Sequence, residues 1–208
     1  MSEWWDGIKA DFVLNFIKED RWMLLATGLG NTLKITFVAL IIGILLGSIV
    51  ATVRSTYDKN GADMSKRNKG GYVVLSIFNI ICKLYLTVIR GTPMVVQLLI
   101  MYFIIFASSK NGLMVAMIAF GINSGAYVAE IIRGGIMSID NGQFEAGRSL
   151  GFNYLQTMRY IIVPQTIKNV LPSLMNEFIA LLKETSVAGY VAVQDLTKAG
   201  DIIRSRTY

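Results

Sequence analysis

The chain has 208 residues, of which 53% are hydrophobic and 16% are charged, whereas a soluble domain of this size usually carries about 25% charged residues. Its formal net charge is +6, and it contains no histidine and a single cysteine, Cys82. These counts exclude an internal disulfide, a zinc site of the usual Cys/His kind and histidine acid–base catalysis. The composition therefore predicts an all-α integral membrane protein, in which basic residues mark loops rather than a nucleic-acid surface.

The N-terminal segment, residues 1–21, mixes acidic with aromatic residues. It lacks the basic start, apolar core and small-residue cleavage site of a signal peptide. Trp4, Trp5 and Trp22 are of the residue type that anchors proteins at the membrane–water interface. We therefore expect residues 1–21 to be an interfacial segment of one membrane domain that covers residues 1–208.

Three later stretches contain no charged residue, namely residues 35–53, 91–109 and 111–129. Each is close to the roughly 20 residues that a helix needs to cross the hydrocarbon core. Within the first stretch, Gly43 and Gly47 form a small-xxx-small pair, a spacing that favours close packing of two helices.

Two segments are rich in lysine and arginine, residues 54–70 and 133–168, with a short turn at Lys110 between the apolar stretches. The positive-inside bias predicts that both basic segments are cytoplasmic and that the N-terminus is outside. The chain must then cross an even number of times between them, yet three apolar stretches lie there: 72–89, 92–107 and 113–132. The first carries Lys83 in its middle. We expect it to lie against the cytoplasmic face or to form the lower part of one broken crossing.

If all three stretches crossed instead, the second basic segment would lie outside. Residues 113–132 carry a polar face made by Asn123, Ser124, Tyr127 and Glu130. Such a face turns toward a water-filled cavity or bonds to neighbouring helices, and both interpretations stay open. Glu130 and Arg133 are three residues apart and are expected to pair.

Residues 138–164 are charged and punctuated by glycine, which predicts two short helices outside the membrane. Asp140, Asn141 and Gly142 suit a turn before a helix over residues 143–150, and Gly151 permits a sharp redirection. Asn153 is suited to cap a second helix, and Pro164 to end or kink it. The face expected for the second helix consists of Leu155, Met158 and Ile162. The segment is either a surface for a cytoplasmic partner or a connecting loop. The apolar residues 170–182 that follow are expected to cross within a bundle.

Six residues of this segment resemble the EAA signature of ABC-importer permease subunits: Glu145, Ala146, Gly147, Gly151, Ile161 and Pro164. Gly147 stands where the signature has a second alanine, and Val163 where it has leucine. Three further passages, RGTPMVVQL (90–98), SGAYVAEIIRG (124–134) and KETSV (183–187), resemble the polar amino-acid branch of histidine, glutamine and arginine permeases. The resemblance covers residues 25–197.

This resemblance implies the helical bundle of a type I ABC-importer permease, with four spans in this chain and a fifth expected after residue 208. It also implies a multi-pass protein of the bacterial plasma membrane. Its partners would be two ATP-binding subunits, a second identical or related permease subunit and an extracytoplasmic solute-binding protein. The residues implied to dock the ATP-binding subunit are Glu145, Ala146, Gly147, Gly151 and Pro164. The chain has no GxxxxGK[ST] loop, so ATP and Mg would be bound by the partner, and we expect no cofactor, metal or enzyme activity here.

A polar amino acid is zwitterionic, so its path through the membrane needs polar partners for both charges. The candidates for these contacts are Gln97, Asn123, Ser124 and Glu184, with Glu177 as a weaker one. Glu184 could instead pair with Lys183 or Arg90. The alternative functions are a secondary transporter, disfavoured because no internal repeat is visible, and a membrane scaffold that transports nothing. An intramembrane enzyme is disfavoured by the lack of a nucleophile–base or metal-ligand cluster.

Overall fold

The computed structural model describes residues 2–109 and 111–207, so the turn expected at Lys110 lies outside the described residues. The described part of the chain consists of helices and short connections, without strands. The elements are α1 (Ser2–Phe12), η1 (Val13–Ile17), η2 (Lys18–Asp20), α2 (Arg21–Arg67), α3 (Lys69–Gly91), α4 (Met94–Ile100), η3 (Met101–Ile105), α5 (Gly112–Met137), α6 (Asn141–Ser149), α7 (Tyr154–Thr157), η4 (Met158–Ile162), α8 (Val163–Glu184), η5 (Thr185–Val191) and α9 (Leu196–Thr207).

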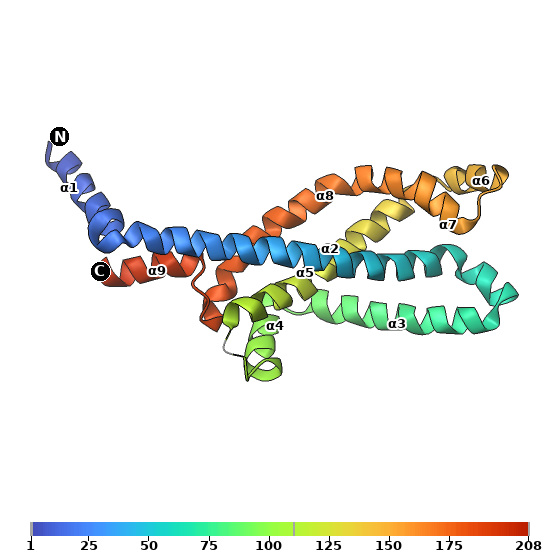
Figure 1. The fold of residues 1–208 in the computed structure, drawn as a ribbon, viewed down its shortest axis with the longest axis horizontal. Helices are drawn as coiled ribbons and strands as arrows, with labels where there is room; N and C mark the ends of the chain where they lie inside the picture. Colours follow the sequence, from blue (N-terminus) through green and yellow to red (C-terminus); the bar gives the residue numbers. More distant parts are fainter. Residues whose placement is uncertain (1, 110, 208) are drawn as a thin grey trace.

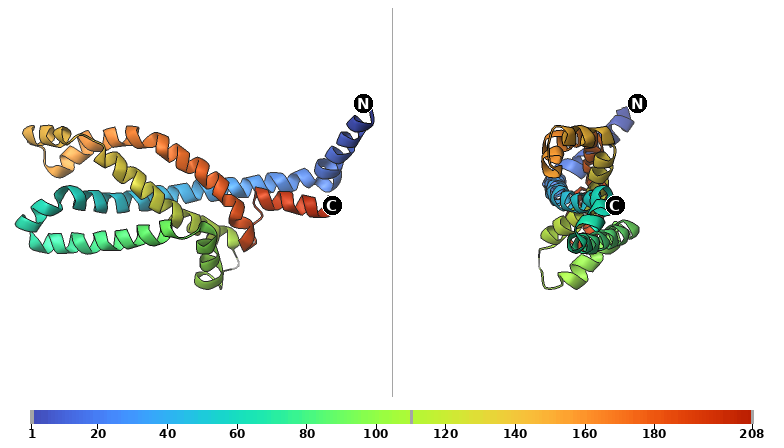
Figure 2. Two further views of the ribbon diagram at one scale, coloured as in Figure 1. Left: turned by 180° about the vertical axis from the view of Figure 1, so that it is seen from behind. Right: turned by 90° about the vertical axis from the view of Figure 1, so that its right-hand side faces the viewer.

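The long helices form an elongated bundle (Figures 1 and 2), in which α2, α3, α5 and α8 extend along the long axis. At one end, α2 turns into α3, and α6 and α7 lie at this same end, which we call the hairpin end. The two termini lie toward the opposite end, which we call the terminal end. Helix α2 has 47 residues, so at 1.5 Å per residue it is about 70 Å long.

Helices α2 and α5 pack closely through the two glycines that the sequence singles out. A Cβ atom on Gly43 would lie 2.7 Å from Ser124 Oγ, and one on Gly47 would lie 2.7 Å from Val128 Cγ1. The same Cβ on Gly47 would lie 2.9 Å from the backbone nitrogen of Ala129. No larger residue fits at this contact without moving the helices, so the predicted small-xxx-small packing is confirmed.

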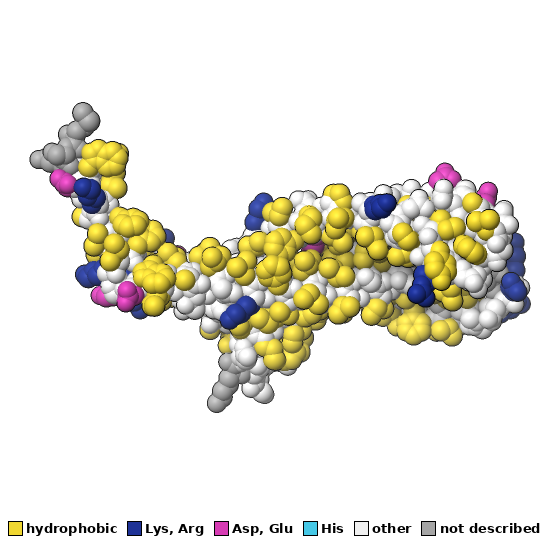
Figure 3. Space-filling model, turned by 45° about the horizontal axis from the view of Figure 1, so that its top comes forward, with side chains coloured by type: hydrophobic (Ala, Val, Ile, Leu, Met, Phe, Trp, Pro, Cys, Tyr) yellow, Lys and Arg dark blue, Asp and Glu magenta, His cyan; other side chains and the backbone are white. Residues whose placement is uncertain are grey.

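The main core lies where α2, α4, α5, α8 and η5 meet. Ile35, Leu98, Phe120 and Leu181 are almost completely buried there. Apolar side chains also cover much of the outside of the bundle, including Ile80, Ile81 and Leu84 on α3. Figure 3 shows hydrophobic side chains along the shaft of one face, with several Lys and Arg side chains at the hairpin end. This distribution suits a protein surrounded by lipid along its length.

Of the two arrangements expected for residues 72–89, the structure agrees with the one in which a break follows them. Residues 72–89 belong to α3, an unbroken helix of 23 residues that is long and apolar enough to cross a membrane. The break lies between this helix and the next stretch, which forms the short elements α4, with seven residues, and η3, with five. Thr92 and Pro93 have extended backbones here, because a proline disfavours helical geometry in the residue before it. Two long apolar helices, α3 and α5, therefore lie between the two basic segments.

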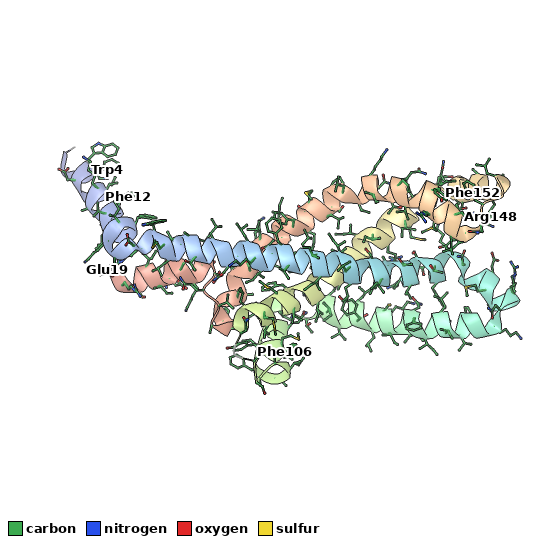
Figure 4. All side chains as sticks on the ribbon, viewed as in Figure 1. Trp4, Phe12, Glu19, Phe106, Arg148 and Phe152 are labelled. Carbon is green, nitrogen blue, oxygen red and sulfur yellow. The ribbon has the colours of Figure 1, made fainter. Side chains whose placement is uncertain are left out.

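The N-terminal segment bends away from the bundle. Glu19 and Asp20 have positive φ angles of 57° and 51°, and α1 projects beyond the end of the shaft, as Figure 4 shows around the labelled Trp4, Phe12 and Glu19. Trp4 is 63% exposed. The base of the segment is fixed by the buried Arg21, whose Nη1 donates hydrogen bonds to Leu14 O at 3.2 Å and to Thr207 Oγ1 at 2.8 Å.

Candidate functional site

The EAA-like segment forms two short helices at the hairpin end. Asp140 caps α6, because its Oδ1 accepts a hydrogen bond from the Gly142 nitrogen at 2.6 Å. The helix consequently begins at Asn141, two residues before the predicted start, and the predicted turn is its cap. Gly151 has a φ angle of +80°, a backbone conformation that glycine adopts without strain. The redirection predicted at Gly151 is confirmed.

The second helix is capped as predicted but continues differently. The Asn153 side chain accepts from the Gln156 nitrogen at 2.9 Å, and Gln156 accepts in return from the Asn153 nitrogen at 2.9 Å. A π-helical turn, η4, then leads directly into α8, so Pro164 does not end the helix but lies in the first turn of α8.

The face predicted for this second helix is wrong in part. Leu155 is 75% exposed, whereas Ile162 is fully buried. The wider π-helical turn between them adds a residue to the turn, so spacings of three and four residues no longer keep Leu155 and Ile162 on one face.

One side of the α6–α7 pair is anchored to the bundle. Phe144 is buried in a cluster with Ile136, Ile139 and Ile162. Lys59, on α2, donates a hydrogen bond from Nζ to Asn141 Oδ1 at 2.6 Å and lies 4.6 Å from the centroid of the Phe144 ring. The hydrogen bond to Asn141 and the cation–π contact with Phe144 together hold the end of α2 against the start of α6.

Gly147 is the point at which α6 packs closely against α7. A Cβ atom at Gly147 would lie 2.7 Å from both Cγ2 and Oγ1 of Thr157. The glycine that stands in place of the signature alanine therefore lets α6 approach α7 more closely than an alanine allows.

The other side of the pair faces outward. Glu145, Ala146, Leu150 and Gly151 are exposed, and Leu150 is 71% exposed. A cleft of about 780 Å³ opens between α6–α7 and the end of α2; Arg148 and Phe152, labelled in Figure 4, belong to its lining. A helix that is fixed on one side and bears an exposed apolar and acidic surface on the other is suited to contact another protein.

Two polar pairs lie where α5 meets α4 and α8. The buried Asn123 donates from Nδ2 to Gln97 Oε1 at 3.0 Å. Gln97 in turn donates from Nε2 to Ile89 O at 2.7 Å and to Thr92 O at 3.0 Å. Gln97 therefore satisfies carbonyl groups that the break between α3 and α4 leaves free. The structure brings these two predicted residues together.

The second pair joins Ser124 to Glu177. The fully buried Ser124 donates from Oγ to Glu177 Oε1 at 2.8 Å. Glu177, which the sequence marked only as a weaker candidate, thus faces α5 directly. Glu184 lies seven residues further along α8, a spacing of two helical turns that places it on the same side of the helix. Among the described residues no salt bridge includes Glu184, so the pairing considered with Lys183 or Arg90 does not form.

An ion network joins α2 and α5 between these pairs and the hairpin end. Arg133 Nη2 lies 3.1 Å from Glu130 Oε2, which confirms the predicted pair. The network is larger than predicted, because Arg133 Nη1 also lies 3.2 Å from Asp58 Oδ2 and Arg54 Nη1 lies 3.6 Å from Glu130 Oε1. The sequence contained no signal for these contacts between helices. In the part of the chain that the structure describes, no group of acidic or cysteine side chains is arranged to hold a metal.

Comparison with known proteins identifies the family. Residues 43–207 match the model of the family described as "binding-protein-dependent transport system inner membrane component". The chain belongs to this family. A putative glutamine transport system permease protein of Rickettsia typhi is 38% identical over 85% of the chain and 75% of its own length. An L-cystine transport system permease protein of Bacillus subtilis is 33% identical over 92% of the chain and 76% of its own length.

Solved structures agree with this assignment. The crystal structure of an amino-acid ABC transporter with histidines matches with a TM-score of 0.74 and 42% identity, over 89% of this chain and 79% of that one. An inward-facing methionine ABC transporter, 20% identical with a TM-score of 0.69, shares the fold. The family member described here is therefore an all-α ABC-transporter permease subunit of the inner membrane, and permease subunits are not enzymes themselves.

Proposed function

We propose that this chain is the translocation subunit of an ATP-driven importer of polar amino acids, with basic or amide side chains favoured. Relatives named for glutamine and arginine transport support the substrate class. The hairpin end would be cytoplasmic and the N-terminus outside. This orientation is supported by the basic residues 54–70 of the α2–α3 hairpin and by Arg148 on α6.

The α6–α7 pair would be the coupling element that contacts a separate ATP-binding subunit. The observation that carries this proposal is the two-sided character of the pair: Phe144 and Gly147 are buried against the bundle, while Glu145, Leu150 and Leu155 are exposed. An element anchored in this way can transmit a push from a partner to α2 and α8. Two ATP-binding subunits that hold ATP and Mg, a second permease subunit and a solute-binding protein would complete the transporter.

The substrate would meet the two polar pairs on α5. An unpaired charge at the centre of a membrane helix costs roughly 2.5–3.5 kcal/mol, which makes the carboxylates of Glu177 and Glu184 suited to bind an ammonium or guanidinium group. Asn123 and Gln97 offer amide donors and acceptors for the uncharged polar groups of a substrate. Ser124 holds the Glu177 carboxylate in place through its hydrogen bond.

Transport by the assembled complex in liposomes tests this function. The complex would be offered radiolabelled basic, amide and acidic amino acids, with ATP inside or outside and with or without the solute-binding protein. Uptake of one class that requires ATP on the cytoplasmic side supports the proposal. Uptake driven by an ion gradient without ATP would identify a secondary transporter, and a complex that takes up none of these amino acids would point to a scaffold.

The coupling assignment has its own test, in which Glu145→Arg is compared with Asp201→Arg. Both acidic residues are exposed, but Asp201 lies on α9 at the terminal end, far from α6. We expect Glu145→Arg to lower ATP-driven uptake and substrate stimulation of the ATPase severalfold, while Asp201→Arg leaves both unchanged. Gly151→Val should act in the same direction as Glu145→Arg. Equal ATP-driven uptake and equal ATPase stimulation in all the variants would contradict the assignment.

The carboxylates are tested by Glu177→Gln and Glu184→Gln. An amide keeps the shape and the acceptor for Ser124 but removes the charge. Uptake of cationic amino acids should therefore fall more than uptake of neutral ones. An equal loss for both classes would show that these side chains do not bind the charged group.

A further inference from the structure

A second cleft, of about 440 Å³, lies between α2, α3 and α5 and is distinct from the one beside α6 and α7. Its polar lining consists of Arg54 from α2, Lys83, Thr87 and Arg90 from α3, and Glu130 from α5. Three cationic side chains therefore surround one carboxylate in a region where the neighbouring α3 side chains Leu84 and Val88 are apolar and exposed.

The single carboxylate does not neutralise this cleft. Glu130 is already shared between Arg54 at 3.6 Å and Arg133 at 3.1 Å. Among the described residues no carboxylate lies within salt-bridge distance of Lys83 or Arg90. The buried Nε of Arg54 also has no hydrogen-bond partner. The cleft thus holds an excess of positive charge and a buried donor, both of which an anion would satisfy.

The cleft lies on the same side of α5 as the Asn123–Gln97 pair. Asn123, Tyr127 and Glu130 are spaced four and three residues apart, so they follow one side of α5 toward the hairpin end. The guanidinium carbon of Arg90 lies 5.5 Å from the centroid of the Tyr127 ring. Gln97, the partner of Asn123, bonds to the carbonyl of Ile89, the residue before Arg90. A polar stripe therefore leads from the Asn123–Gln97 pair into the basic cleft.

We propose that this cleft binds the α-carboxylate of the amino acid as the substrate passes from the Asn123–Gln97 pair toward the hairpin end. Guanidinium groups bind carboxylates through paired, charge-assisted hydrogen bonds, and Lys83 adds a point charge beside them. The proposal rests on the proposed amino-acid transport.

Cysteine labelling measures the charge of the cleft without requiring transport. Thr87→Cys would be introduced together with Cys82→Ser, which leaves the introduced thiol as the single thiol of this chain. The assembled complex in lipid nanodiscs would be labelled with two reagents, the anionic sulfonatoethyl methanethiosulfonate and the cationic trimethylammonioethyl methanethiosulfonate. The labelling rate of each reagent would be divided by the rate at which the same reagent reacts with a free thiol. We expect the anionic reagent to react at least about fivefold faster, since each nearby unit charge contributes an effect of this order.

Matched charge variants assign this preference to the two α3 side chains. Lys83→Gln and Arg90→Gln should each reduce the preference severalfold, whereas Lys83→Arg and Arg90→Lys should keep it. A preference that is absent, or that survives both neutral variants, would overturn the proposal.

Protection identifies the bound group. L-arginine and L-glutamine should slow the labelling, while L-argininamide and L-glutaminamide, in which the carboxylate is blocked, should not. Equal protection by the acids and their amides would contradict carboxylate binding. If none of them protects, the cleft does not bind the substrate carboxylate and the proposal is wrong; a labelling rate that then differs between phosphatidylglycerol and phosphatidylcholine nanodiscs would point to an anionic lipid headgroup in its place. If carboxylates protect although the liposomes show no ATP-driven uptake, the proposed function fails while the anion site stands.

Discussion

Replacing Gly47 by alanine should separate the two central helices. The added Cβ would lie 2.7 Å from Val128 Cγ1, 2.8 Å from Val128 Cβ and 2.9 Å from the backbone nitrogen of Ala129. The valine methyl can rotate away, but the Ala129 nitrogen belongs to α5 itself. Helices α2 and α5 must therefore move apart by about half an ångström before the contact reaches an ordinary van der Waals distance.

Overpacking of this kind typically destabilises a protein by about 1–3 kcal/mol. At about 3 °C per kcal/mol for a chain of this length, Gly47→Ala should lower the melting temperature by about 3–9 °C. The matched control is Gly30→Ala in the same helix, where nothing lies within 4 Å of the added Cβ. Alanine favours a helix over glycine by up to about 1 kcal/mol, so the control should be unchanged or slightly more stable.

The assay is thermal denaturation of the purified complex in detergent, followed by gel filtration with fluorescence detection. The double variant Gly47→Ala/Val128→Ala should recover part of the loss, because it relieves the contact with Val128 Cγ1 and leaves that with Ala129. If Gly47→Ala melts at the same temperature as Gly30→Ala, the helices are not held together by this contact and the reasoning is refuted.

Three further changes test other parts of the structure. Gly151→Val should destabilise the α6–α7 pair by about 1–2 kcal/mol more than Gly151→Asn, because a left-handed backbone is strained for a branched residue; equal protease resistance of the two variants at this loop would contradict this. Lys59→Met should weaken the contact between α2 and α6 and lower ATPase stimulation, with Lys59→Arg as the charge-preserving control; identical stimulation in both would show that the contact carries no coupling. Arg133→Met should lower thermal stability by about 1–3 kcal/mol, since it leaves Glu130 and Asp58 with fewer partners; a larger loss in Asp58→Asn than in Arg133→Met would show that Arg133 is not the centre of the network.

The sequence predicted local features well where the residue type alone decides them. Gly151 adopts the left-handed backbone that favours glycine, Asn153 caps a helix, and Gly43 with Gly47 makes a close helix contact. Each of these depends on neighbouring residues in the chain or on the absence of a side chain. Such properties are readable without knowing which helices meet.

The errors came from features that depend on the packing around a segment. Lys83 lowers the hydropathy of residues 72–89, but its side chain lines a polar cleft and the helix stays intact. The break follows this helix, at Thr92 and Pro93, for steric reasons. Glu177 was underrated because its partner, Ser124, is 53 residues away in the sequence. Leu155 was misplaced because a π-helical turn has no recognisable sequence pattern here.

Because α2 is long, a small tilt of this helix displaces the hairpin end by a large distance. A bilayer with its headgroups is about 40–45 Å thick, so a helix of about 70 Å extends well beyond it. Gly47 is held tightly against α5 and can serve as the pivot point of a tilt. Lys59 lies 12 residues, or about 18 Å, further along α2. Tilting α2 by about 5° about this point moves the Lys59 backbone by about 1.6 Å, which is more than half the length of its 2.6 Å bond to Asn141. A small change of helix angle at the core is thus large enough to displace α6, and a push on α6 is correspondingly converted into a small rotation between α2 and α5.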